Sequence, residues 1–144
     1  QELIREYKGI KFINDTTATS PIGAIQALNS IAGKIILIAG GVDKNLEYKE
    51  FGELLIKKYS KKELKHLILF KNNFTTSTDK ILKIISDKIQ YEFADSMKVA
   101  VKKAYTKAEK GDIILLSPGG ASFGMFQHEF DRGDKFNKEV KKIK

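Results

Sequence analysis

Cysteine is absent from this 144-residue chain. Without it the protein has no disulfide, no thiolate metal site and no cysteine nucleophile. Long apolar runs are also missing, because none approaches the roughly 20 residues of a membrane span. The first residues lack the pattern of a signal peptide. We therefore expect a cytoplasmic protein with no membrane partner.

Arginine is scarce, since only Arg5 and Arg132 accompany the lysines that make up the rest of the 26 basic residues. The formal net charge of +8 suggests nucleic acid, but surfaces that bind nucleic acid favour arginine for bidentate and stacking contacts. No RNP, KH or zinc-finger signature is present. We therefore expect a solvated lysine-rich surface and no nucleic-acid partner, with at most a mild attraction for phosphorylated substrates.

The sequence also lacks the usual motifs of catalysis and metal binding. The phosphate-binding pattern GxxxxGK[ST] does not occur. His66 and His128 are far apart and show no metal-ligand spacing, and no Ser/His/Asp triad can be argued. The run Asp131-Arg132-Gly133-Asp134 is interpreted as a helix break with a local ion pair. We expect no catalytic residue and no metal ligand in this chain.

Hydrophobic periodicity predicts one α/β domain over residues 1–144, long enough to bury about two-thirds of its unfolded surface. The pattern indicates a mostly parallel, Rossmann-like sheet with helices on both faces and an antiparallel hairpin at the start. Strands are expected at 3–7, 10–13, 35–39, 66–70 and 113–116. Helices are expected after the N-cap Ser20, at 47–59, after Ser77 or Thr78, after Asp95, and from 117 to the end with a break near Gly133.

Three loops rich in small and hydroxyl residues each follow an apolar strand. They are the first loop, NDTTATSP (residues 14–21), the second loop, GGVDKN (40–45), and the third loop, SPGGASFGMF (117–126). In an open α/β sheet, ligands bind outside the carboxyl ends of the strands, where such loops gather. The three loops therefore predict a site for a polar, anionic small molecule.

Each loop taken alone leaves two interpretations open. The short polar side chains of the first loop suit an anion or ribose hydroxyls at a helix N-terminus, but they equally suit a helix cap. Lys44 in the second loop has the reach to meet a carboxylate or phosphate, or it is an ordinary surface lysine. Ser122 in the third loop is either an N-cap or a group that binds a substrate carboxylate.

Taken in order, the segments IKFINDTTAT, GG-x-x-K and GDIILLSPGGASFGMF, followed by FDRGDKF, resemble the C-terminal domain of the Mur ligases. The resemblance covers essentially the whole chain and is greatest to the members that add D-glutamate to UDP-N-acetylmuramoyl-L-alanine in peptidoglycan synthesis. It implies a three-domain, ATP-dependent ligase that forms an acyl phosphate, which the amine of D-glutamate then attacks. The UDP-binding and central ATPase domains would lie outside this chain, and the central domain would bind most of the ATP and magnesium.

The resemblance also implies roles for particular residues. Thr19, Lys44 and Ser122, with the backbone of Phe123, are expected to bind D-glutamate. Asn14 and Asp15 are expected to face the nucleotide. The chain alone is expected to be an inactive monomer.

The family pattern is broken at two places. Many relatives carry lysine where this chain has Thr17, so no charge-based role is assigned there. Relatives often read FKNFEERG where this chain reads FQHEFDRG, which displaces the aromatic residue to Phe130. Two alternatives remain: the same domain of another Mur or folylpolyglutamate-type ligase, or a free-standing basic module that binds nucleotides or nucleic acid.

Overall fold

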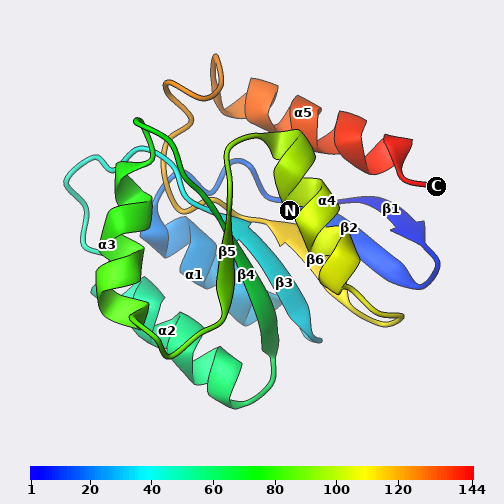
Figure 1. Ribbon diagram of the computed structural model, residues 1–144, viewed down its shortest axis with the longest axis horizontal. Helices are drawn as coiled ribbons and strands as arrows, with labels where there is room; N and C mark the ends of the chain where they lie inside the picture. Colours follow the sequence, from blue (N-terminus) through cyan, green and yellow to red (C-terminus); the bar gives the residue numbers. More distant parts are fainter.

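The computed structural model describes residues 1–144 and shows a six-stranded sheet between two layers of helices (Figure 1). The strand order is β1-β2-β6-β3-β4-β5, with β1 antiparallel to β2 and the other neighbours parallel. The strands are β1 (Glu2–Tyr7), β2 (Ile10–Asn14), β3 (Ile35–Ala39), β4 (Leu64–Phe70), β5 (Tyr91–Ala94) and β6 (Ile113–Leu116). The helices are α1 (Pro21–Ser30), α2 (Lys49–Ser60), α3 (Thr76–Ile85), α4 (Met97–Lys107) and α5 (Glu129–Lys142). The expected fold class is confirmed.

The central strands are apolar throughout because both of their faces are covered. Along β3, Leu37 packs toward α1, α2 and α3, whereas Ile36 and Ile38 pack toward α4 and α5. All five residues of β3 and all four of β6 are buried. Continuous Ile and Leu runs are typical of strands buried on two sides. No helix is long and apolar enough to cross a membrane.

The chain leaves neighbouring strands in opposite directions at the carboxyl edge of the sheet. After β2 and β3 it continues into α1 and α2 on one face, whereas after β6, which lies between them, it continues into α5 on the other face (Figure 1). This reversal opens a crevice between the loops of an open α/β sheet. The three loops lie at this crevice.

Several local predictions are confirmed. Lys8 and Gly9 both have positive φ, 51° and 79°, as a two-residue hairpin turn requires. Ser20 caps α1 by accepting a hydrogen bond from the backbone N–H of Gly23 (3.3 Å), and Pro21 is the first helical residue. The local rules therefore fix the start of the first helix correctly.

Other predicted boundaries are wrong. Ser77 and Thr78 do not precede α3 but lie in its first turn, and α4 is capped by Ser96, not by Asp95. Strand β5 was not predicted. Residues 117–128 are not helical, and α5 begins only at Glu129, where His128 caps it.

The predicted break at Gly133 is also wrong, because α5 runs through it without interruption. The glycine is there for packing: a Cβ at this position would lie 2.7 Å from Cγ2 of Thr16 in the first loop. Gly133 therefore lets α5 approach the first loop closely.

Candidate functional site

The first and third loops are joined by hydrogen bonds at the carboxyl edge of the sheet. The backbone N–H of Asp15 donates to the carbonyl of Leu116 (2.7 Å), and that of Gly119 donates to the carbonyl of Ala18 (2.9 Å). The hydroxyl of Ser117 donates to the carboxylate of Asp15 (2.9 Å). These contacts hold both loops in one position.

The second loop is paired with the third as a short antiparallel bridge. Val42 and Ala121 exchange two backbone hydrogen bonds of 2.8 and 3.0 Å. The backbones approach so closely that a Cβ on Gly41 would lie 2.4 Å from the carbonyl oxygen of Ala121. The paired glycines of these loops therefore serve close backbone approach.

The start of α3 is a fourth segment of the site, which sequence reasoning missed. The hydroxyl of Ser77 accepts a hydrogen bond from the N–H of Gly41 (2.8 Å), and the N–H of Ser77 donates to the carbonyl of Gly41 (3.0 Å). The hydroxyl of Thr76 accepts from the N–H of Asp43 (2.9 Å). The hydroxyl cluster TTST thus supports the second loop in addition to starting a helix.

Arg132 is the largest fully buried side chain near the loops, with 1 % of its surface exposed. Its guanidinium donates to the hydroxyl and carbonyl of Thr16 (3.0 and 2.6 Å) and to the carbonyl of Gly120 (3.0 Å). Burial lowers the pKa of Arg132 to about 10, so that the side chain is a cation at neutral pH. The expected local ion pair of Arg132 is therefore wrong, and the nearby ion pair joins Asp131 to Lys135 (3.2 Å). Arg132 instead links the first and third loops.

Tyr48, which directly precedes α2, supports the third loop from the face of the sheet opposite to Arg132 and α5. Its buried hydroxyl donates to the carbonyl of Gly119 (2.7 Å). Burial raises the pKa of Tyr48 to about 12, so the phenol stays protonated and able to donate. Neither Tyr48 nor Arg132 was identified from sequence as part of the site. The one signal in the sequence that could have pointed to Arg132 is the scarcity of arginine.

Lys44 and Phe123 come together across the second and third loops. The ammonium nitrogen of Lys44 lies 5.7 Å from the centre of the Phe123 ring, within the range of a cation–π contact. Lys44 forms no ion pair within the chain, and 59 % of Phe123 is exposed. The ammonium is therefore free to meet an anion from solvent.

Ser122 and Thr19 carry hydroxyl groups that make no hydrogen bond within the chain. Ser122 has only 6 % of its surface exposed, and its neighbour Ala121 is bonded to the second loop. No buried side-chain oxygen lacks a partner, so the hydroxyl of Ser122 must reach solvent. Thr19 is half-buried. Both hydroxyls can donate to a ligand.

Asn14 and Asp15 lie where the first loop leaves β2, but most of their polar atoms are engaged. The amide nitrogen of Asn14 donates to the carbonyl of Gly133 (3.2 Å) and to Oδ1 of Asn137 (2.9 Å), and its oxygen accepts from the N–H of Thr16 (3.0 Å). Asp15 is 7 % exposed and accepts from Ser117. Asn14 thus has a structural role that the sequence did not suggest.

Two hollows flank the loops. One of about 290 Å³, between the first loop and α5, is lined by Asn14, Thr16, Thr17 and Phe130 among others. Another, of about 350 Å³, lies between the starts of α1 and α2 and includes Ile22 and Leu46. 

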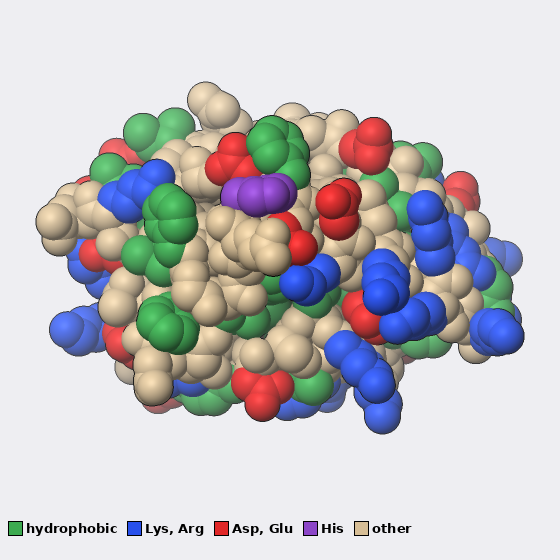
Figure 2. All heavy atoms as spheres, turned by 90° about the horizontal axis from the view of Figure 1, so that it is seen from above, with side chains coloured by type: hydrophobic (Ala, Val, Ile, Leu, Met, Phe, Trp, Pro, Cys, Tyr) green, Lys and Arg blue, Asp and Glu red, His purple; other side chains and the backbone are tan.

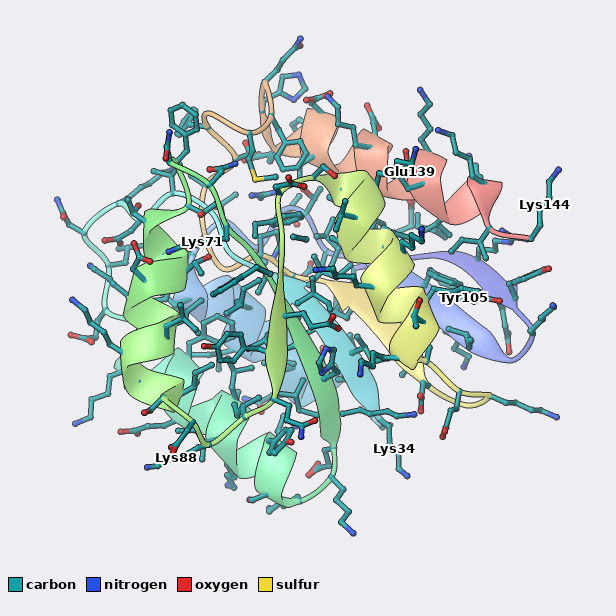
Figure 3. All side chains as sticks on the ribbon, viewed as in Figure 1. Lys34, Lys71, Lys88, Tyr105, Glu139 and Lys144 are labelled. Atoms are coloured by element: carbon teal, nitrogen blue, oxygen red, sulfur yellow. The ribbon has the colours of Figure 1, made fainter.

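A larger cavity of about 510 Å³ includes Lys34, Lys62 and Lys65 and opens at the amino ends of the strands. The label of Lys34 in Figure 3 marks that opposite end. This cavity is therefore not part of the crevice. No group of three or more His, Cys, Asp or Glu side chains could hold a metal ion.

An α/β sheet with three joined loops and an unpaired lysine at its carboxyl edge defines the class: a Rossmann-like domain with the crevice at which open α/β sheets bind ligands. The family is shown by comparison with known proteins. The chain belongs to the family described as "Mur ligase, glutamate ligase domain", whose model matches residues 1–120.

Two relatives illustrate the likeness. The UDP-N-acetylmuramoylalanine–D-glutamate ligase of Acetivibrio thermocellus is 38% identical over 99% of this chain. The enzyme of the same name from Caldanaerobacter subterraneus is 40% identical over 96%. The chain spans about 30% of the length of each.

Solved structures show the same fold at lower identity. A MurF ligase from Thermotoga maritima in complex with ADP has a TM-score of 0.55 at 23% identity, covering 96% of this chain and 30% of that one. A domain from a putative UDP-N-acetylmuramate:L-alanyl-gamma-D-glutamyl-medo-diaminopimelate ligase of Haemophilus ducreyi has a TM-score of 0.55 at 16% identity, covering 83% and 87%.

Proposed function

We propose that this chain is the amino-acid-binding domain of an ATP-dependent ligase that joins D-glutamate to UDP-N-acetylmuramoyl-L-alanine. The names of the relatives support this substrate. The observation that carries the proposal is the unpaired ammonium of Lys44, placed next to the loop that presents the free hydroxyl of Ser122. A dicarboxylic amino acid needs two such sites, one for each carboxylate.

In this proposal Lys44 pairs with the side-chain carboxylate of D-glutamate. The hydroxyl of Ser122 and the backbone N–H of Phe123 bind a carboxylate, and Thr19 adds a hydroxyl contact from the first loop. Charge-assisted hydrogen bonds of this kind are stronger than neutral ones and fix orientation. The substrate is thereby oriented by contacts from all three loops, of which the first and third are held in place by Arg132 and Tyr48.

The reaction proposed for the complete ligase proceeds through an acyl phosphate. The carboxylate of UDP-N-acetylmuramoyl-L-alanine attacks the γ-phosphorus of ATP and releases ADP. The amine of D-glutamate then attacks the acyl carbon, phosphate leaves, and the amine loses a proton. The role of this chain is to bind and orient the amine-bearing substrate, which lowers the entropic part of the barrier.

ATP and magnesium would be held mainly by a central domain outside this chain. The residues described here form no cluster suited to magnesium, and no step is assigned to the metal. Asp15, at the exit of β2, would face the nucleotide from this side, with Asn14 fixing its position. We further propose a cytoplasmic monomer in which residues 1–144 form one domain without ATPase activity of its own.

The substrate assignment is tested with the full-length enzyme and a panel of amino acids. D-Glutamate should be the preferred acceptor over L-glutamate, D-aspartate, L-lysine and meso-diaminopimelate, with UDP-N-acetylmuramoyl-L-alanine as the second substrate. Preference for a diamino acid, or glutamylation of folate, would identify another ligase of the superfamily. Magnesium-dependent ATP turnover by the 144-residue chain alone would contradict the assigned division between domains.

A further inference from the structure

A second concave site lies between α4 and α5, away from the three loops. This groove has a volume of about 290 Å³, and four of the eight residues that line it are lysines. Those lysines are Lys98, Lys102, Lys142 and Lys144. Figure 3 labels three groove residues, Tyr105, Glu139 and Lys144, which come from the two helices and the end of the chain. The proposed ligase reaction uses none of them.

The positive charge in the groove is only partly neutralised by the chain. Glu139 is its one acidic residue and is paired with Lys142 (3.3 Å). The ammonium groups of Lys98 and Lys102 form no ion pair or hydrogen bond. They are one helical turn apart on α4, about 6 Å along the helix axis, where like charges repel. An anion placed between them would relieve that repulsion.

The floor of the groove contains a packed aromatic ring whose hydroxyl is free. The Tyr105 ring packs against the rings of Tyr7 (centre distance 6.5 Å) and Phe12 (6.3 Å), while its hydroxyl makes no hydrogen bond. Arg5 donates to the carbonyls of Val140 and Ile143 (2.8 Å each), which fixes the end of α5. The groove therefore combines unpaired cations with a fixed hydrogen-bond donor.

We propose that the α4–α5 groove binds a small multivalent phosphate anion. Lysine ammoniums act as compact point charges for phosphate oxygens, and the Tyr105 hydroxyl supplies a directed donor. A groove of about 290 Å³ is large enough to admit a pyrophosphate-sized anion. Its lysines lack the planar fork with which arginine reads bases, which favours the small anion over RNA or DNA.

The test is an NMR titration of the ¹⁵N-labelled 144-residue chain with inorganic pyrophosphate at 150 mM KCl. Amide signals of residues 98–105 and 139–144 should shift in a saturable manner, and those of residues 40–45 and 117–126 should not. The double variant Lys98→Gln/Lys102→Gln should bind pyrophosphate about tenfold or more weakly, since two charge contacts are lost. The control Lys83→Gln/Lys88→Gln alters α3 and the turn after it, changes the net charge equally, and should weaken binding less than about twofold.

Tyr105→Phe separates the groove from general electrostatic attraction, because it keeps the ring and the charge but removes the donor. It should weaken pyrophosphate binding by about tenfold, because the hydrogen bond that is lost has a charged acceptor. Equal weakening by the two lysine double variants, or shifts spread over all lysine-bearing elements, would overturn the proposal. So would tighter binding of a single-stranded RNA oligomer with the same dependence on Lys98 and Lys102, which would make the groove a nucleic-acid site.

Discussion

The two halves of α5 use positive charge in opposite ways. In the first half, the guanidinium of Arg132 is buried and donates to carbonyl and hydroxyl oxygens of the first and third loops. In the second half, the exposed Lys142 lines the α4–α5 groove beside Glu139, together with two lysines of α4 and with Lys144 after the helix. Figure 2, which looks onto this helix, shows more Lys and Arg side chains on the right of the view than on the left. Whether a cation of α5 holds loops together or faces solvent therefore depends on its position along the helix.

The hydroxyl groups at the carboxyl edge of the sheet also form two sets, one bonded within the chain and one free. Those of Thr16, Ser77 and Ser117 are bonded within the chain and hold the loops. Those of Thr19 and Ser122 make no internal hydrogen bond. The bonded set builds the site, and the free set is available to a ligand.

The largest expected effect is that of removing the buried cation. Arg132→Met leaves two carbonyls and a hydroxyl without their donor, so the free energy of unfolding should fall by about 3–5 kcal/mol. Urea unfolding measures this change. Lys138→Met, which removes an exposed lysine from the same helix, should change stability by less than about 0.5 kcal/mol. If both variants lost the same free energy of unfolding, the buried and exposed cations of α5 would not differ in their contribution to stability.

Tyr48→Phe should destabilise the chain by about 1 kcal/mol at pH 7, because Gly119 loses its phenol donor. The folded pKa of about 12 lies above the usual 10, so the folded state holds the phenolic proton more tightly. This contribution is fully present below pH 10 and is lost as the pH rises to about 12. The stability difference between wild type and variant should therefore shrink over that window. A constant difference would show that the phenol is not the titrating group.

The contact between Phe123 and Lys44 should appear as a coupling in substrate affinity. In the full-length enzyme, Phe123→Ala should raise the D-glutamate KM by about two- to fivefold with little change in kcat, as loss of a cation–π contact of about 0.5–1 kcal/mol implies. In a Lys44→Ala background the same change should have almost no further effect. Simple additivity of the two substitutions would mean that the ring does not position the ammonium.

The smallest effect concerns the groove and has the opposite sign. Lys98→Glu replaces a repelling pair with an i,i+4 attraction to Lys102 and places an acid in the first turn of α4. Stability should rise by about 0.5 kcal/mol at low salt and by less at 1 M KCl. A loss of stability at low salt would show that the lysines in the groove do not repel each other.

The fold was largely predictable because its signals are local. Buried runs at 35–39 and 113–116, together with the cap Ser20-Pro21, indicate strands and a helix by their own residues. β5 was missed because it is four residues long, with Glu92 and Phe93 at least partly exposed. A short, partly exposed edge strand is identified only once β4 lies beside it.

The residues that hold the three loops in place could not be predicted, because their contacts join segments that are distant in sequence. Gly133 resembles a helix break until Thr16 is seen against it, and Ser77 resembles an N-cap until Gly41 is found bonded to it. Arginine is usually exposed, so nothing local marks Arg132 as buried. Lys44 and Ser122 were predicted as ligand-binding residues from loop chemistry and the family pattern, and that role stays a prediction.

Lys44→Ala in the full-length enzyme tests the central claim most directly. Loss of a charge-assisted contact worth about 1.5–3 kcal/mol should raise the D-glutamate KM by about ten- to a hundredfold. The KM for ATP and the free energy of unfolding should hardly change, and Lys88→Ala, at an exposed turn outside the loops, should leave all three values as in the wild type. A normal D-glutamate KM in Lys44→Ala would contradict the account and leave Lys44 an ordinary surface residue.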